Sequence, residues 1–545
     1  MKLRLAEIFT SRMVLQHGKE INIFGTGETN QQVTITIQGQ TATTTIINNN
    51  WLITLPALEI STDETLTVST GLETITLSNI LIGDVYFLAG QSNIEFKFKD
   101  CDSVKVDQEV CYDRYLRYYE VPQIEYEDEN IKIPPIRNQG WQICDNQTIN
   151  DFSAIGYYLA YYLRHDIDIP IGLIAVNKGG TSGSCWINET YLQKNQEIKK
   201  VYYDEYYQAI MNQTEAQEDL KIAKYKERVK QYQQKVALYQ QTYPERNMSQ
   251  LKKDVGHTPW PGPRGKKDFC RPAGLYYTMF KKICQYSGKA VIWYQGEEDT
   301  KNAYLYHQLL QLVIENWRED MKAQIPFIIV QLPEYDDDKN DNWPILRDAQ
   351  QQVCREVPAC YLVVTMNCGE EFNIHPQNKK TVGHRIFWRI KELFYDNQFN
   401  GHSPKIINIE NNSKIIIEFD QKLHSRGINN FILELPDHQV ETVGIIKENK
   451  LLVERPAQVR TISYGYQNYC KISIFGENNL PIAPFKIQLT KIICHFYFKS
   501  NDICSVLKKL GNFRRSLQSA LFLFSSAKRK EFQNLKLLFN FIQKV

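Results

Sequence analysis

Four short stretches of the sequence contain residue types that together catalyse acyl transfer. They are Gly90-Gln91-Ser92-Asn93, Asn177-Lys178-Gly179-Gly180-Thr181, Gln295-Gly296-Glu297-Glu298-Asp299, and the loop from Asn367 to Pro376 that contains His375. Acyl transfer through a covalent intermediate needs a nucleophile, a base, and hydrogen-bond donors for an oxyanion. A serine, a histidine, a pair of glycines and an amide supply these parts, so the sequence predicts a serine esterase site.

Ser92 and His375 are the predicted nucleophile and base. A serine hydroxyl is a weak nucleophile until a neighbouring base takes its proton. Of the ten histidines, His375 is the one that falls on a strand-end loop of the predicted sheet. Imidazole titrates near neutral pH and therefore suits proton transfer. We expect the two side chains to lie within hydrogen-bond distance of each other.

The oxyanion of the tetrahedral intermediate needs donors close to Ser92. Glycine lets the backbone approach a reacting atom closely, so the backbone N–H groups of Ser92 and Gly179 are the first candidates. The side-chain amide of Gln295 is a third candidate. Neither a CxxC pair nor a Cys/His cluster with zinc spacing occurs, so we do not expect a structural metal.

Each of these features has an ordinary explanation when it stands alone. A Gly-x-Ser is more often a helix N-cap, a glycine pair is usually a turn, and a His-Pro pair is often only a loop. Position 94 is Ile, so the G-x-S-x-G elbow of α/β-hydrolases is absent. The site is predicted because all four features follow successive strands of one sheet.

The central part of the chain alternates apolar β-rich runs with amphipathic helical segments. The apolar runs are Asp84–Ala89, Ile171–Val176, Ala290–Tyr294, Pro326–Leu332 and Cys360–Met366. Helical periodicity covers Phe152–Arg164, Leu275–Cys284, Tyr304–Met321, Ile345–Arg355 and Lys379–Phe394. Such alternation predicts an α/β fold with a parallel five-stranded sheet flanked by helices. Ligands of open parallel sheets bind beyond the carboxyl ends of the strands, which is where the four stretches lie.

We divide the chain into four regions. Residues 1–80 and 401–487 consist of short alternating runs with turns between them, so each predicts a β-sandwich module. Residues 81–400 form the esterase domain. Residues 195–265 interrupt it with a long segment without Gly or Pro, which predicts an inserted helical hairpin or a coiled-coil partner site. Residues 488–545 form an atypical basic tail, either a membrane-surface helix or an appended reading frame without a selected fold.

Composition and charge exclude several classes of partner. The net charge of +2 gives no reason to expect binding to nucleic acid, and no apolar stretch is long enough to predict a membrane span. Met1–Gly18 lacks the features of a secretory signal, so the chain as written is expected in the cytoplasm. Cys101 and Cys111 are candidates for a disulfide in an oxidising compartment. The sequence does not indicate an oligomeric state.

The motifs resemble those of the sialate O-acetylesterase family, a group of SGNH-type hydrolases, over about residues 5–487. The resemblance rests on Met13-Val14-Leu15-Gln16, Gly83-Asp84-Val85 with Gly90-Gln91-Ser92-Asn93, Pro170-Ile171-Gly172-Leu173-Ile174 with Gly179-Gly180-Thr181 and Trp186, Trp293-Tyr294-Gln295-Gly296-Glu297, Leu346-Arg347-Asp348-Ala349-Gln350, Ile374-His375-Pro376 with Lys379, and Asn479 to Phe485.

The resemblance implies an SGNH-like fold and a substrate that is an O-acetylated sialic acid or another acetylated sugar. It also implies a lysosomal or secreted location, and an enzyme that uses neither a metal nor an organic cofactor. It implies the same roles as the residues themselves, with Ser92 as nucleophile, His375 as base, and Ser92, Gly179 and Gln295 as oxyanion donors. Within the same motifs we expect Asn93, Glu297 and Arg347 to contact the substrate.

The sequence departs from the family pattern next to the histidine. Many relatives carry Asp two residues before it, where this chain has Asn373. An asparagine cannot stabilise an imidazolium charge as a carboxylate does. Glu370 is our candidate for the missing carboxylate, Glu371 is a second one, and a Ser–His dyad without a carboxylate is the third possibility.

Two other functions stay open at this stage. A glycan-binding homologue with a weakened site would bind sugars without releasing acetate. A lipid or thioester hydrolase on the same fold would need an apolar acyl tunnel beside Ser92.

Overall fold

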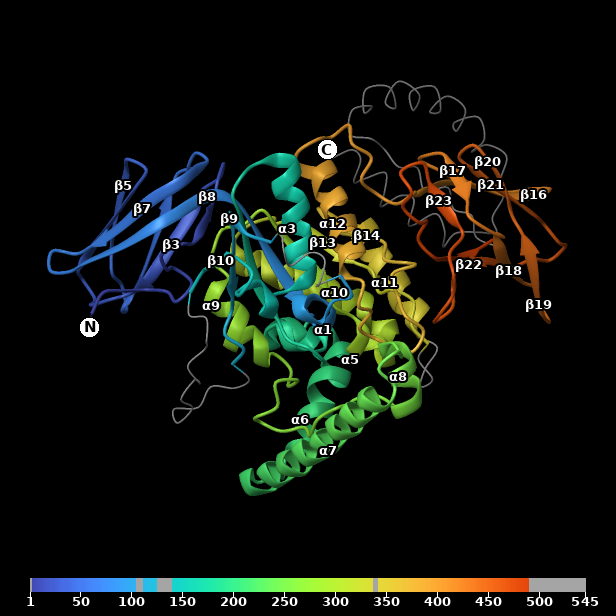
Figure 1. The fold of residues 1–545 in the computed structure, drawn as a ribbon, viewed down its shortest axis with the longest axis horizontal. Coiled ribbons are helices and arrows are strands. Elements are labelled where there is room, and N and C mark those ends of the chain that lie inside the picture. Colours follow the sequence, from blue (N-terminus) through green and yellow to red (C-terminus); the bar gives the residue numbers. More distant parts are fainter. Residues whose placement is uncertain (1, 104–110, 125–139, 337–341, 490–545) are drawn as a thin grey trace, which may run out of the picture. The chain divides into compact units, whose positions relative to one another are not determined.

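One long strand positions the predicted nucleophile. In the computed structural model, which describes residues 2–103, 111–124, 140–336 and 342–489, strand β8 runs over Thr74–Gly90 (blue in Figure 1). Its first half pairs with β7 of the N-terminal region, and its second half pairs with β11 and β12 of the central sheet. β8 therefore crosses the predicted boundary between residues 80 and 81 without a break and delivers Ser92 two residues after its end.

The N-terminal region consists of two small sheets, one of them β1-β3-β6 and the other built on β4, β5 and β7. β2 pairs with β8 next to this second sheet. Along β4, β6 and β7, buried Val, Ile, Trp and Leu alternate with more exposed and mostly polar residues, so each sheet buries one face. The strand bounds are Arg4–Leu5 (β1), Val14–Gln16 (β2), Ile21–Thr26 (β3), Gln32–Ile37 (β4), Gln40–Thr45 (β5), Asn50–Leu55 (β6) and Ser61–Ser69 (β7).

The central sheet contains all five predicted strands as immediate neighbours. Its order is β10-β9-β11-β8-β12-β13-β14, and every neighbouring pair from β9 to β14 is parallel. All residues of β11 and β12 are buried, as expected for parallel strands covered on both faces. The strand bounds are Asp113–Glu120 (β9), Gln142–Cys144 (β10), Ile171–Asn177 (β11), Ala290–Tyr294 (β12), Phe327–Val330 (β13) and Cys360–Val363 (β14).

The sequence analysis did not predict β9 and the antiparallel edge strand β10. β9 reads Asp-Arg-Tyr-Leu-Arg-Tyr-Tyr-Glu, and its charged residues hide the apolar run that marks the other strands. The Arg117 side chain in its middle is buried and donates from Nε to the carbonyl oxygen of Arg114 and from Nη2 to Asn79. A strand that buries a hydrogen-bonded arginine has no apolar signature in the sequence.

Helices cover the central sheet where the sequence predicted them. The segment 275–284 is the exception, because it forms a π-helical turn, Tyr276–Phe280, followed by the short α9. The helix bounds are Ser92–Glu95 (α1), Ala154–Ile167 (α3), Glu189–Leu192 (α4), Lys281–Ile283 (α9), Ala303–Met321 (α10), Trp343–Glu356 (α11) and Lys379–Phe394 (α12).

The predicted insert is helical. It contains α5 (Gln196–Ile198), α6 (Glu205–Ile210), α7 (Glu215–Thr242) and α8 (Met248–Val255). α7, the long green helix in Figure 1, starts at a capping box of Thr214 and Gln217, and one of its residues, Glu218, is buried. α8 packs on α7, so the insert includes a helical hairpin.

The C-terminal region forms two four-stranded antiparallel sheets, β15-β16-β21-β20 and β19-β18-β22-β24, which share one apolar core. The segment from Tyr469 to Ser473 is irregular, and β23 begins at Ile474. Its Ile472 instead forms two backbone hydrogen bonds with the side chain of Asn367. The strand bounds are Ile406–Asn411 (β15), Lys414–Phe419 (β16), Leu423–Ser425 (β17), Asn430–Glu434 (β18), Gln439–Val443 (β19), Ile445–Lys447 (β20), Lys450–Glu454 (β21), Thr461–Tyr464 (β22), Ile474–Gly476 (β23) and Phe485–Gln488 (β24).

Three further expectations concern cysteines, membranes and the tail. Cys101 and Cys111, the candidates for a disulfide, are both buried. None of the described helices has the length and apolar character of a membrane span. The predicted tail lies outside the described residues from residue 490 on.

A buried carboxylate, Asp84, anchors the start of the central half of β8. It is fully buried and accepts hydrogen bonds from Gln16 at 2.8 Å, from Lys289 at 2.7 Å and from the Tyr395 hydroxyl, and His17 lies 3.1 Å away. Burial alone would raise the pKa of this carboxyl, but its hydrogen bonds and the charge of Lys289 outweigh burial and hold the pKa well below its usual range.

We expect Asp84→Asn to destabilise the protein by about 2–4 kcal/mol, because it leaves Lys289 without its buried partner. Since the folded-state pKa of Asp84 is lowered, its contribution is present above the ordinary carboxyl pKa of about 3.9 and is lost as the pH falls below that value. Urea unfolding at pH 7 measures the effect. Asp168→Asn is the control, since this carboxylate is 94% exposed and we expect a change below about 0.5 kcal/mol. Equal losses in both variants would contradict the anchoring role.

Candidate active site

The turn after β8 places Ser92 at the carboxyl edge of the central sheet. Gly90 has φ +130°, and a Cβ there would lie 2.1 Å from the carbonyl oxygen of Tyr294, so only glycine fits. The next residue, Gln91, donates its backbone N–H to the same carbonyl oxygen at 3.1 Å. The chain then enters α1, whose first residue is Ser92.

His375 reaches Ser92 from the loop before α12. Its Nε2 lies 2.7 Å from Ser92 Oγ, although 283 positions separate the two residues. Burial lowers the pKa of His375 to about 3, and the positive charges of Lys379, Lys252 and His257 add to this shift. The imidazole is therefore neutral at neutral pH, which is the form that can accept a proton from the serine hydroxyl.

The predicted carboxylate does not contact the imidazole ring. Within the described residues, His375 Nδ1 has no hydrogen bond to a carboxylate. Glu370 instead accepts hydrogen bonds from Asn373 Nδ2 at 3.1 Å and from the backbone N–H of Gln377 at 2.8 Å. Asn373 in turn accepts from the His375 N–H at 3.2 Å and donates to the His375 carbonyl oxygen at 2.8 Å. The two side chains thus shape the histidine loop through its backbone. The exposed Glu371 has no side-chain bond to His375 either.

Asn93 connects the serine turn to the histidine loop. It is fully buried, and its Nδ2 donates to Glu297 Oε1 at 2.5 Å and to the carbonyl oxygen of Ile374 at 3.0 Å. Its Oδ1 accepts from Lys379 Nζ at 2.5 Å. The structure therefore brings the predicted substrate residues Asn93 and Glu297 next to Ser92 and His375, but in a buried network below them.

Two ionisable groups of this network have strongly shifted pKa values. Burial raises the pKa of Glu297 to about 7, although the hydrogen bond from Asn93 works against the shift. Burial also lowers the pKa of Lys379 to about 8. The second carboxylate oxygen of Glu297 is buried and has no hydrogen-bond partner among the residues that the structure describes. Perturbed groups of this kind cluster at functional sites.

The loop Asn177–Thr181, called the glycine loop below, lies against Ser92 as predicted, but the N–H group of Gly179 already has an acceptor. A Cβ added at Gly179 would lie 3.3 Å from the Cβ of Ser92. The Gly179 N–H donates to Glu95 Oε2 at 2.5 Å, and the other oxygen of Glu95 accepts from Gln123 at 2.7 Å. Glu95 is thus a site residue that the sequence analysis missed.

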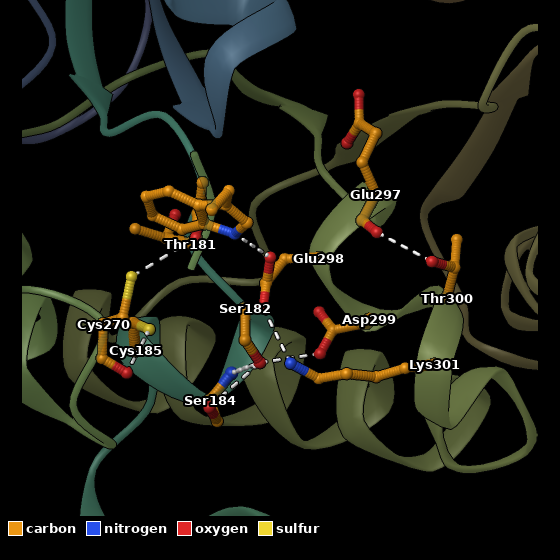
Figure 2. A network of polar contacts seen from close by, with 12 residues as sticks. Thr181, Ser182, Ser184, Cys185, Cys270, Glu297, Glu298, Asp299, Thr300 and Lys301 are labelled. Atoms are coloured by element: carbon orange, nitrogen blue, oxygen red, sulfur yellow. Dashed lines mark hydrogen bonds and ion pairs between the residues drawn. The ribbon is translucent and has the colours of Figure 1, made fainter. Parts of the chain in front are cut away.

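The Gln295 amide faces the protein interior. It is fully buried and donates to Gln91 Oε1 at 3.1 Å, to the Thr181 carbonyl oxygen at 3.0 Å and to Asp299 Oδ2 at 2.7 Å. Asp299 also accepts from Ser182 Oγ at 2.6 Å (Figure 2). These contacts correct the prediction of Gln295 as an oxyanion donor, because its N–H groups already have acceptors and instead hold the glycine loop.

Arg347 does not join the site. It is fully buried on α11 and donates to the carbonyl oxygen of Pro333 at 3.3 Å and to that of Gln467. Burial lowers its pKa to about 10. The predicted substrate contact is therefore replaced by a structural one, in which a guanidinium ties α11 to the C-terminal region.

Several residues near the site come from positions that sequence reasoning treated as background. Lys379 was noted as part of a motif without a role, and Lys252, His257 and Trp260 fall in the insert and its return linker. Lys252 and His257 lie close enough to His375 to lower its pKa. The Pro- and Gly-rich sequence around Trp260 gives no sign that this segment folds back to the site. Across the described residues, no group of three or more His, Cys, Asp or Glu side chains is arranged to hold a metal ion.

The chain is similar to known carbohydrate esterases. A family model described as carbohydrate esterase, sialic acid-specific acetylesterase, matches residues 262–387. The chain is 23% identical to sialate O-acetylesterase of Rattus norvegicus, over 89% of this chain and 94% of the relative. It is 22% identical to sialate O-acetylesterase of Homo sapiens, over 79% of each chain.

A carbohydrate acetylesterase from Xanthomonas citri has the same fold, with a TM-score of 0.69 and 20% identity, over 89% of this chain and 99% of that one. The residues that the family model matches include the motifs around Gln295, Arg347 and His375. The chain is similar to the sialate O-acetylesterases, a family of carbohydrate esterases, and is a carboxylic ester hydrolase.

Proposed function

We propose that this protein removes O-acetyl groups from a sugar, with Ser92 as nucleophile and His375 as base. The observation that carries the proposal is the 2.7 Å contact between Ser92 Oγ and His375 Nε2 beside the glycine loop. The names of the relatives, which are sialate and carbohydrate acetylesterases, support acetyl as the acyl group and a sugar as the alcohol.

The reaction follows from this pair in two steps. Ser92 Oγ attacks the acetyl carbonyl carbon while its proton passes to His375 Nε2. The tetrahedral intermediate then expels the sugar oxygen, which takes that proton from His375 and leaves as the free hydroxyl. In the second step, a water molecule gives a proton to His375 and attacks the acetyl-Ser92 ester. Collapse returns the proton to Ser92 and releases acetate.

The backbone N–H groups of Ser92 and Gly179 are the proposed oxyanion donors. The Ser92 N–H has no acceptor among the described residues. The Gly179 N–H must exchange the Glu95 carboxylate for the oxyanion. Gln295 contributes indirectly, since its amide holds the Thr181 carbonyl oxygen of the same loop at 3.0 Å.

Sialic acid is the sugar that the charges near His375 favour. Lys379 is buried, but Lys252 lies on α8 and His257 on the linker that follows it, and both act on His375 electrostatically. Positive groups around a site attract an anionic substrate, and sialic acid carries a carboxylate. An acetylated neutral sugar would gain nothing from them.

Ser92→Ala should abolish the acetate release, because no other hydroxyl replaces the nucleophile. We expect kcat/KM to fall by at least about 10³-fold. The measurement is acetate release from an O-acetylated sialoside, from an acetylated neutral sugar and from p-nitrophenyl acetate. Ser61→Ala in β7 is the control and should keep wild-type rates. Turnover that survives in Ser92→Ala would refute the mechanism, and a marked preference for long acyl chains would point to a lipid or thioester hydrolase.

Glu370→Gln distinguishes a dyad from a triad. Because Glu370 contacts Asn373 and Gln377 but not the imidazole, we expect kcat to fall by less than about 10-fold, whereas the loss of a triad carboxylate costs about 10⁴-fold. Steady-state kinetics with p-nitrophenyl acetate measure the difference. Glu371→Gln, on an exposed neighbour, should be neutral. A loss near the triad value would mean that Glu370 reaches the ring during catalysis.

Lys379→Met should shift the pH dependence of kcat/KM. The base must be neutral, so activity is lost as the pH falls through the pKa of His375. The charge of Lys379 lowers that pKa, and its removal should therefore move the acid limb to higher pH, toward the ordinary imidazole value of about 6.5. Lys380→Met is the control and should leave the limb in place. Circular dichroism spectra check that the variants fold, and an unmoved limb in folded Lys379→Met would contradict the electrostatic role.

A further inference from the structure

We propose that Trp260, which the helical insert contributes, is the platform on which the sugar ring of the substrate stacks. The inference rests on the proposed sugar esterase function and adds a specificity residue to it. Trp260 belongs to the linker that follows α8, a segment that connects two parts of the fold and needs no aromatic side chain for that purpose.

The indole lies next to the glycine loop of the site. A Cβ added at Gly180 would lie 2.5 Å from two carbons of the Trp260 ring, so the ring packs directly on that residue. The preceding residue, Gly179, borders Ser92 in the same way at 3.3 Å. Gly180 has φ +73° and bears no side chain, which lets the ring approach the loop closely. Trp260 therefore packs on Gly180, and the residue before it, Gly179, packs on the proposed nucleophile Ser92.

Several contacts fix the ring and its segment. The indole Nε1 donates to Glu298 Oε2 at 2.7 Å. Two tyrosines of α7 hold the linker, because the Tyr225 hydroxyl donates to the Pro259 carbonyl oxygen and the Tyr232 hydroxyl to the Gly256 carbonyl oxygen, each at 2.9 Å. A ring held in place before the ligand arrives loses little conformational entropy on binding.

Trp260 is more open to solvent than the other tryptophans. The structure describes all eight tryptophans. Trp260 is 38% exposed, whereas the other seven are buried or partly buried. Its polar edge is already satisfied by Glu298, so the exposed part offers an apolar face. The apolar C–H face of a pyranose ring fits such a surface.

Polar groups border the ring where sugar hydroxyls need partners. Glu298 accepts from Lys301 Nζ at 2.7 Å as well as from the indole (Figure 2). An aromatic face with a few placed charged groups is the usual composition of a site that orients a small ligand. The acyl group would thus lie at Ser92 while Trp260 and Glu298 hold the sugar.

Kinetics with two substrates test the platform. We expect Trp260→Ala to lower kcat/KM for an O-acetylated sialoside by about 10-fold or more, mainly through KM. The rate with p-nitrophenyl acetate, which has no sugar, should stay within about two-fold. Trp260→Phe should recover most of the loss, since it restores an aromatic face. Tyr243→Ala is the matched control, because Tyr243 lies in the same insert and is 40% exposed.

Two outcomes would overturn the inference. An equal loss with both substrates would mean that Trp260 only supports the glycine loop, and unchanged kinetics with both would mean that the sugar does not touch it. A binding titration separates this failure from failure of the proposed function. Calorimetry with the sialoside compares Ser92→Ala with Ser92→Ala/Trp260→Ala, so binding is measured even if the wild type does not turn the sugar over. Absent binding, or binding that Trp260→Ala leaves unchanged, also rejects the platform.

Discussion

The three hydrogen bonds of the buried Asn93 side chain hold the site together. They join the turn after β8 to Glu297 after β12, to the backbone beside His375, and to Lys379 at the start of α12. A buried amide without these partners would carry a large desolvation cost, so the network favours one arrangement of the segments. The contact between Ser92 and His375 depends on this arrangement, because neither residue is near the other in sequence.

The same burial determines the electrostatics of the site. Desolvation lowers the pKa of His375 and of Lys379 and raises that of Glu297. The pKa values of Lys379 and Glu297 therefore lie close to pH 7. A neutral imidazole is a competent proton acceptor, but burial also makes its protonated form costly. In the proposed mechanism the imidazolium of His375 is transient, and no carboxylate of the described residues touches its ring. The fixed hydrogen bonds of the loop and the negative charge of the developing oxyanion must therefore stabilise the imidazolium in place of a carboxylate.

The helical insert is part of the functional region as well as a surface addition. Its helix α8 contacts the histidine loop, because the backbone N–H of Phe372 in that loop donates to the Ser249 hydroxyl of α8 at 3.1 Å. Lys252, His257 and Trp260 come from the same short stretch. In the proposed mechanism, the insert thus supplies charge and an aromatic ring to one side of a site whose proposed nucleophile and base lie on loops at the edge of the central sheet.

The sequence by itself predicted the alternating α/β pattern, the five neighbouring strands, and Ser92 and His375 as partners. These features are local, since apolar runs, helical periodicity and glycines at strand ends are written in contiguous residues. The tertiary structure alone decided which way the side chains face. It turned Gln295 and Arg347 into buried structural groups, kept Glu370 away from the imidazole, paired Glu95 with Gly179, and brought Trp260 to the glycine loop. The physical reason is that a hydrogen bond depends on distance and direction between groups that are far apart in the chain, and sequence spacing fixes neither.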